Sequence, residues 1–249
     1  MDSISRFSGR AEHYEAARPA YAHALLQRLD QDCHLPTAAI ADVGSGTGKL
    51  SRQLLEQGSQ VFGVELNQDM RQAAERSLAA FPRFRSVNGT AEHTTLDRGS
   101  VDLVTAAQAF HWFQPDAFLQ ECRRILRPGG SVALIWNLRD MGAPVNQAWA
   151  DLCRRYCPDF QGFTNGLTPN DPHIRGFFPG ECRYCAFPHP LYYDWEGFLR
   201  RCLSSSFSLR EGDGKFRAYQ DELAALFQEF ARQGVLELPN ETVAYLGSV

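Results

Sequence analysis

With 249 residues, 44% of them apolar and 22% charged, the chain has the composition of a globular protein, which excludes disordered and fibrous classes. A formal net charge of −4, with no block of Lys or Arg, argues against nucleic-acid partners and anionic membrane surfaces. No apolar run approaches the roughly 20 residues of a membrane span, and the amino terminus shows no apolar core of signal-peptide length.

The first half of the chain alternates short apolar runs with helical patterns, an order typical of a parallel sheet covered by helices. The spacing of Tyr21, Leu25 and Leu29 predicts a helix that starts near Pro19. Later helices are predicted over residues 49–58, after an N-cap at Asn67, and from Pro115. The turn RPGG ends the last of these. Strands are predicted at residues 38–44, 60–66, 83–89, 101–109 and 131–137.

The alternation breaks down after Asn137. Residues of about 140 to 180 are rich in proline, glycine and aromatic residues, with one helical stretch at 149–156. A connection of this length is typical of a lid or a binding insertion. We expect it to be mobile and to meet the amino-terminal segment over the carboxyl ends of the strands. The pattern then predicts a strand at 182–189, helices near 194–205 and 223–230, and a last strand at 241–249.

Residues 42–58 read DVGSGTGKLSRQLLEQG, and glycine-rich turns of this kind serve nucleoside triphosphates, dinucleotides or S-adenosylmethionine. A triphosphate loop fails twice, because Val43 stands where its first glycine belongs and Leu50 replaces the metal-binding hydroxyl. A dinucleotide loop needs G-x-G-x-x-G, whereas the third glycine, Gly48, comes one residue early. The dinucleotide therefore stays as an alternative.

S-adenosylmethionine carries no phosphate, so its loop must allow close backbone approach rather than hold an anion. Gly44, Gly46 and Gly48 keep side chains out of the way at the end of the first predicted strand. Asp42 offers an acceptor for the ammonium group of the ligand. Glu65, 21 residues after Gly44, can accept hydrogen bonds from both ribose hydroxyls.

The motifs ADVGSGTGKLS, VFGVELNQDM, NGTAEHTTL and RPGG resemble, in order and spacing, those of class I S-adenosylmethionine-dependent methyltransferases. YEAARPAY, AQAFHWF and VAYLG are similar to the small-molecule branch related to trans-aconitate methyltransferase. The resemblance implies an α/β fold, with a Rossmann-like, seven-stranded, mostly parallel sheet, helices on both faces and an antiparallel last strand. It implies one domain, 1–249, with a cap segment at 1–30, a cofactor-binding half at 38–137, a lid at about 140–180 and completion of the sheet at 181–249.

The same resemblance implies a site at the carboxyl ends of the strands. His111 is expected to contact the methionine end of the cofactor or the substrate, and it is the candidate for proton transfer. Trp112 and Trp136 are expected to contact the substrate. The residues expected to bind S-adenosylmethionine are Tyr14, Arg18, Asp42, Gly44, Ser45, Gly46, Thr47, Gly48, Glu65, Leu66, Met70, Thr90, Ala91, Glu92, Ala107, Gln108 and His111.

The expected reaction is methyl transfer to a small acceptor, a carboxylate or a hydroxyl, with no nucleic-acid or membrane partner and a monomer or homodimer as the working form. Aromatic faces such as Tyr14 or Trp112 could stabilise the sulfonium. Two alternatives remain open, an NAD(P)-dependent oxidoreductase and a non-catalytic scaffold that binds the cofactor.

The seven cysteines are odd in number and irregularly spaced, which argues against a disulfide framework and favours the reducing cytosol. Cys153, Cys157, Cys182 and Cys185 together could form a zinc site. The first pair, however, fits one face of a helix and the second a strand, so we expect packed free thiols and no metal.

Overall fold

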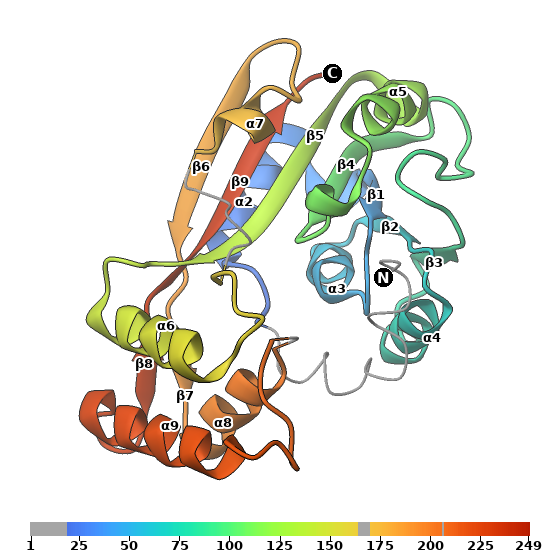
Figure 1. The fold of residues 1–249 in the computed structure, drawn as a ribbon. Coiled ribbons are helices and arrows are strands. Elements are labelled where there is room, and N and C mark those ends of the chain that lie inside the picture. Colours follow the sequence, from blue (N-terminus) through green and yellow to red (C-terminus); the bar gives the residue numbers. More distant parts are fainter. Residues whose placement is uncertain (1–18, 164–169, 206) are drawn as a thin grey trace.

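The computed structural model describes residues 19–163, 170–205 and 207–249. Within them, a seven-stranded sheet has the order β3-β2-β1-β4-β5-β9-β6 (Figure 1). The first five strands run parallel, and β9 is antiparallel to both β5 and β6. The predicted mostly parallel sheet with an antiparallel last strand is therefore confirmed. The strands are β1 (Ala39–Val43), β2 (Gln60–Val64), β3 (Phe84–Val87), β4 (Val101–Ala107), β5 (Leu126–Arg139), β6 (Cys182–Pro188) and β9 (Asn240–Gly247).

The position of β1 in the sheet determines where a ligand can bind. All five of its residues are buried, as expected of a parallel strand that is covered on both faces. The chain continues from β1 to β2 and β3 on one side, and then crosses from β3 to β4 on the other side of β1, so the strand order reverses at β1. Open α/β sheets bind their ligands at such a switch point.

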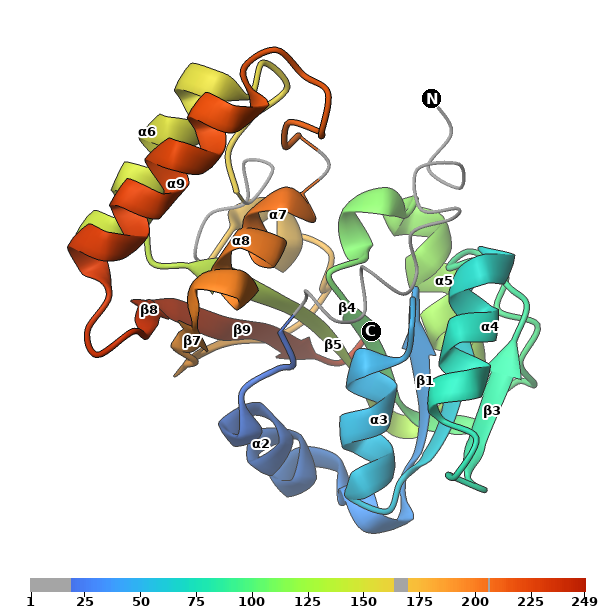
Figure 2. The ribbon, with the colours of Figure 1, turned by 90° about the horizontal axis from the view of Figure 1, so that it is seen from below.

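Helices cover both faces of the sheet (Figure 2). On one face, α2 (His23–Cys33) and α3 (Lys49–Glu56) pack against β1 through Leu25 and Leu54. On the other face lies α5 (Pro115–Ile125). The predicted N-cap is confirmed, since Oδ1 of Asn67 accepts a hydrogen bond from Met70 N (3.1 Å) at the start of α4 (Gln68–Ser77). None of the helices in the described ranges is long and apolar enough to cross a membrane. The short elements are the 3₁₀ turns η1 (Leu35–Thr37) and η2 (Phe110–Trp112) and the helix α7 (Pro172–Arg175).

A second, smaller unit has its own apolar core, and we call it the cap. In Figure 1 it lies below the sheet, beyond the carboxyl end of β5, from which α6 continues. It consists of α6 (Pro144–Tyr156), β7 (Leu191–Tyr193), α8 (Trp195–Leu203), α9 (Phe216–Phe230) and β8 (Leu236–Leu238). The expectation that residues 181–249 complete the sheet is therefore wrong for 191–238. Their apolar side chains pack on α6, and only β6 and β9 join the sheet.

The RPGG segment is not a turn between a helix and a strand. β5 already begins at Leu126, which pairs with Val101, and the next paired residue of β5 is Ser131, opposite Leu103. The four residues 127–130 therefore bulge out of a single strand of 14 residues. Gly129 supplies the positive φ (+84°) within this bulge.

Candidate functional site

The loop between β1 and α3 contains the glycine-rich segment, and backbone hydrogen bonds hold its shape. The N–H groups of Gly44 and Ser45 both donate to the Val64 carbonyl of β2 (2.8 and 3.2 Å), and Gly48 N donates to Ser45 O (2.9 Å). Gly44, Gly46 and Gly48 have φ of +68°, +56° and +84°. This left-handed conformation favours glycine, so the backbone alone explains why the segment needs glycines.

The space around the loop distinguishes the three glycines from one another. A Cβ at Gly44 would lie 2.6 Å from Cβ of Ala109, and one at Gly48 would lie 2.7 Å from Cδ1 of Leu78. Packing therefore excludes side chains at both positions. Among the described residues, a Cβ at Gly46 would meet nothing within 4 Å. The predicted contact of Gly46 with the cofactor stays a prediction.

Glu65, the first residue after β2, braces this loop. Its Oε2 accepts a hydrogen bond from Gly46 N (3.0 Å), and its Oε1 accepts one from Asn67 N (2.8 Å). Each carboxylate oxygen can accept a second bond. The side chain is half-buried, so it links the glycine loop to the start of α4 and can still face a ligand.

Asp42 lies underneath the loop rather than at its surface. The side chain is 1% exposed, and its two oxygens accept hydrogen bonds from Ser51 Oγ (2.6 Å) and Thr105 Oγ1 (2.9 Å). Burial raises the pKa of Asp42 to about 6, against the lowering effect of these two hydroxyls. The geometry therefore gives Asp42 a supporting role, joining α3 to β4 beneath the glycines. Its predicted contact with an ammonium group stays a prediction.

Substitution of Asp42 by asparagine tests this supporting role. The pKa of Asp42 is about 6 in the folded chain against an ordinary 3.8, so the folded state binds the proton more tightly. The contribution of Asp42 to the free energy of unfolding therefore rises as the pH falls from 7 toward 4, by about 1.4 kcal/mol per unit of pKa difference. Urea unfolding at pH 7, 6 and 5 should show the wild type gaining stability relative to Asp42→Asn on acidification. A stability difference that does not change with pH would contradict the assignment.

Residues 88–94, between β3 and β4, contain the segment predicted to face the adenine. Oε1 of Glu92 accepts a hydrogen bond from Gln114 N (2.9 Å), which ties the segment to the start of α5. Thr90 Oγ1 accepts one from His93 N (3.1 Å), and Ala91 is buried. Two further residues were predicted to bind the cofactor near this segment. Leu66, in the loop between β2 and α4, is 42% exposed, whereas Met70 is a core residue of α4. The adenine contacts of these residues stay predictions.

β4 ends at Ala107, and Gln108 follows it in a strained conformation. Its φ is +56°, which residues with a Cβ rarely adopt. Two hydrogen bonds hold it there, from its backbone N to Ile135 O (2.8 Å) and from Nε2 to Asn137 O (3.2 Å). Strain of this kind, of order 1–3 kcal/mol, persists where the surrounding structure enforces it, often at functional sites. Gln108 thereby turns the chain from β4 into η2 at the rim of the sheet.

The residues predicted to contact the substrate lie at two depths, two of them in the η2 turn and one in β5. His111 and Trp112 are exposed at the rim, with ring centroids 4.9 Å apart. Partial burial of the His111 ring lowers its pKa. Trp136 of β5 lies deeper than expected for a substrate contact, at 2% exposure, and packs edge-on against Phe110 and Tyr245.

The aromatic residues that suggested a mobile lid are core residues instead. Trp149 belongs to the core of the cap, whereas Phe177 and Phe178 belong to the core of the sheet under α5. Arg139, the last residue of β5, joins the two units. Its guanidinium carbon lies 4.3 Å from the ring centroid of Trp149 and 3.8 Å from that of Phe163, within cation–π range. The predicted motion of residues 140–180 remains to be measured.

The four cysteines considered as a zinc site do not come together. Cys182 packs against the core on the α5 face of the sheet, and Cys185 packs against the core on the α2 face. Cys153 and Cys157 lie in the cap, where their thiol neighbour is Cys202. In the described part of the chain, no group of three or more His, Cys, Asp or Glu side chains is arranged to hold a metal ion.

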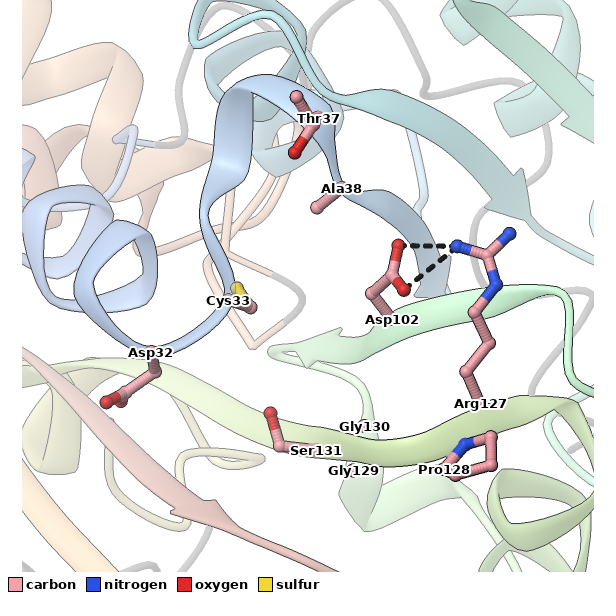
Figure 3. A pocket seen from close by; sticks show the side chains of 10 residues that line it. All are labelled: Asp32, Cys33, Thr37, Ala38, Asp102, Arg127, Pro128, Gly129, Gly130 and Ser131. Atoms are coloured by element: carbon pink, nitrogen blue, oxygen red, sulfur yellow. Dashed lines mark hydrogen bonds and ion pairs between the residues drawn. The ribbon is translucent and has the colours of Figure 1, made fainter.

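A surface hollow of about 330 Å³ lies at the opposite end of the sheet from the glycine loop (Figure 3). Both oxygens of Asp102 accept hydrogen bonds there from Nη1 of Arg127 (2.9 and 2.8 Å), and Asp102 also accepts one from Ala39 N (2.8 Å). These bonds hold together the starts of β1, β4 and β5. Because the hollow lies at the amino ends of these strands, we assign it a structural role.

Two predicted residues, Tyr14 and Arg18, lie outside the described residues. Sequence reasoning missed Asn137, the polar residue that ends the apolar strand predicted at 131–137 and lies within β5; its polar side chain in an apolar strand was the signal that could have found it. Its Oδ1 accepts a hydrogen bond from Thr242 Oγ1 (2.6 Å), and its Nδ2 donates to Ala20 O (2.9 Å). Asn137 therefore connects the rim at Gln108 to β9 and to the chain that enters α2.

Comparison with known proteins agrees with this architecture. A family model described as a methyltransferase domain matches residues 41–134, a range that begins in β1 and ends in β5. An uncharacterized methyltransferase-like protein of Schizosaccharomyces pombe is 28% identical over 97% of this chain and 94% of its own length. An uncharacterized methyltransferase of Mycobacterium tuberculosis is 40% identical over 56% of this chain and 55% of its own length, so this match spans about half of the relative.

Among solved structures, an S-adenosylmethionine-dependent methyltransferase from Thiobacillus denitrificans, in complex with S-adenosyl-L-homocysteine, superposes with a TM-score of 0.53. The superposition covers 100% of this chain and 99% of that one at 15% identity, and at that identity it shows the shared fold.

Proposed function

We propose that this chain, which belongs to the class I S-adenosylmethionine-dependent methyltransferases, transfers a methyl group to a small-molecule acceptor. The observation that carries the proposal is the cap, which lies beyond the carboxyl end of β5 and so at the rim that also holds the glycine loop. A separate unit beyond the β5 part of this rim limits the space there, which favours a small acceptor over an extended polymer. The net charge of −4 points in the same direction.

We also propose how the chain holds S-adenosylmethionine, which supplies an electrophilic methyl group on a sulfonium. The open face of Gly46 fits a ligand lying against the loop, and Glu65 has carboxylate lone pairs left for ribose hydroxyls. Leu66, exposed by 42%, offers an apolar surface to the adenine. The chain orients the two reactants and excludes water, the contribution expected of an enzyme whose cofactor carries the reactive group.

Of the two acceptor classes, we favour a carboxylate, because a carboxylate needs no general base whereas a hydroxyl does.

Transfer of label from methyl-labelled S-adenosylmethionine to a protein-free small-molecule extract tests the proposed function, with S-adenosyl-L-homocysteine binding measured by calorimetry. We expect binding together with labelled small products. Binding without label in any product would favour a non-catalytic scaffold. Binding of NADH in place of S-adenosyl-L-homocysteine would favour an oxidoreductase.

Substitution of His111 by alanine separates the two acceptor classes. Burial lowers the pKa of His111 below its ordinary 6.5, so the neutral imidazole predominates above that lowered value. With a hydroxyl acceptor, kcat should rise with pH through that pKa, and His111→Ala should lower it by roughly 10²–10⁴-fold. With a carboxylate acceptor, both effects should be absent. His23→Ala, at an exposed position on α2, is the control and should leave the pH profile unchanged. A hydroxyl acceptor turned over equally by His111→Ala would exclude the base role.

We further propose that the protein works in a reducing compartment such as the cytosol. All seven cysteines are free thiols. Burial raises the pKa of Cys153 to about 12 and also raises the pKa of Cys202 well above its ordinary value, so both thiols stay protonated and unreactive.

A further inference from the structure

Trp136 carries a buried donor with no acceptor. The side chain is 2% exposed, and its Nε1–H forms no hydrogen bond with any group in the described residues. Buried polar atoms in folded proteins nearly always have partners, and an unmet donor costs about 1–3 kcal/mol. Phenylalanine at this position would fill an apolar core without that cost, so the indole nitrogen calls for an explanation.

The position of Trp136 points to the acceptor side of the site. The two residues that flank Trp136 in β5 hold the strained Gln108: the Ile135 carbonyl accepts a hydrogen bond from the Gln108 backbone N–H, and the Asn137 carbonyl accepts one from the Gln108 side chain. The Trp136 ring packs edge-on against Phe110, with centroids 6.4 Å apart. Phe110 starts the η2 turn that exposes His111 and Trp112 at the rim. The unmet donor thus lies directly behind the turn at the carboxyl end of β4.

The covering side chains are aromatic and come from short segments. Phe110 is 8% exposed, and Phe177, which follows the four-residue helix α7, packs against it with ring centroids 5.0 Å apart. Aromatic walls around one donor are typical of small-ligand sites, which are mostly apolar with few placed polar groups.

We propose that the Nε1–H of Trp136 donates a hydrogen bond to the methyl acceptor, at a lone pair of an oxygen beside the atom that receives the methyl group. This inference rests on the proposed function, and it gives Trp136, which the sequence predicts to contact the substrate, a specific role in selecting the acceptor. A carboxylate has such a second oxygen, whereas a simple amine or thiol has none. The hydrogen bond forms only in the complex, which explains why the donor is unmet in the chain alone.

Trp149 supplies a matched control. Its Nε1 is also buried and also lacks an acceptor within the ranges that the structure covers, but it lies in the core of the cap, where Arg139 stacks on its ring. Trp136→Phe and Trp149→Phe each remove one unmet N–H and shrink one buried ring. Their effects on stability should therefore be similar, whereas only Trp136→Phe should affect the acceptor.

The experiment measures initial rates of label transfer from methyl-labelled S-adenosylmethionine into a protein-free small-molecule extract at serial dilutions. We expect Trp136→Phe to raise the apparent KM for the extract roughly fivefold to tenfold relative to Trp149→Phe, the loss expected for one hydrogen bond. The dissociation constant for S-adenosyl-L-homocysteine should be equal in both variants. If Trp136→Phe fails to fold, 3-benzothienylalanine incorporated at Trp136 removes the N–H and keeps the ring shape.

Equal apparent KM values in the two variants, or in wild type and the benzothienyl variant, would overturn the assignment of Trp136 and leave the proposed function intact. The absence of label transfer by the wild type, with S-adenosyl-L-homocysteine still bound, would instead overturn the proposed function and this inference with it.

Discussion

Replacement of Glu65 by alanine will raise the dissociation constant for S-adenosyl-L-homocysteine at least tenfold. The proposed bonds from ribose hydroxyls to the carboxylate are charge-assisted and are worth on the order of 1.5–3 kcal/mol. The structure adds a second reason, because the same carboxylate accepts bonds from Gly46 N and Asn67 N and so shapes the loop that faces the ligand. Calorimetric titration measures the affinity, and thermal melting shows whether the chain stays folded.

Two further variants make the result specific. Glu75→Ala removes an exposed glutamate from the neighbouring helix α4 and should bind as the wild type does. Glu65→Gln keeps one acceptor oxygen but places an amide N–H₂ near one of the two backbone donors, so it should fall between wild type and Glu65→Ala. An unchanged dissociation constant in Glu65→Ala would remove this residue from the site.

The half of the chain that holds the glycine loop could be predicted from its sequence because local rules determine it. Three glycines after a buried strand implied a tight loop, and all three have positive φ. The N-cap at Asn67 and the start of α5 at Pro115 follow from side-chain and backbone chemistry within a few residues, and both are confirmed. The seven-stranded, mostly parallel sheet with an antiparallel last strand followed from the resemblance to a known fold.

The remainder depends on contacts between residues that are far apart in the chain, and a single sequence does not reveal them. Asp42 was read as a ligand contact because it ends a strand, but hydroxyls 9 and 63 residues away enclose it. The sequence left open a zinc group of Cys153 with cysteines of the sheet and did not reveal its neighbour in the cap, Cys202. The burial of Trp136 likewise depends on Tyr245 and on Phe110, which reach it from β9 and η2.

Replacement of Gly46 by alanine will weaken cofactor binding strongly while costing little stability beyond backbone strain. Alanine at φ +56° costs roughly 1–2 kcal/mol, and the added methyl group meets no atom of the described residues within 4 Å. The methyl group would instead occupy the space proposed for the cofactor. We expect the dissociation constant for S-adenosyl-L-homocysteine to rise at least tenfold, as measured by calorimetry.

Alanine variants of Gly99 and Gly44 are the controls for this prediction. Gly99→Ala isolates the effect of backbone strain, and Gly44→Ala adds the effect of a steric clash. Gly99 precedes β4 at the other end of the sheet, has φ of +61°, and also has nothing within 4 Å of an added Cβ. Gly99→Ala therefore carries the same strain and should bind the cofactor normally. Gly44→Ala adds a clash, since its Cβ would lie 2.6 Å from Ala109 Cβ, and it should lose roughly 1–3 kcal/mol more stability than either. Gly46→Ala and Gly99→Ala carry the same backbone strain, and only Gly46 lies at the proposed cofactor site. Equal affinity of the two variants for S-adenosyl-L-homocysteine would therefore show that the cofactor does not lie against Gly46.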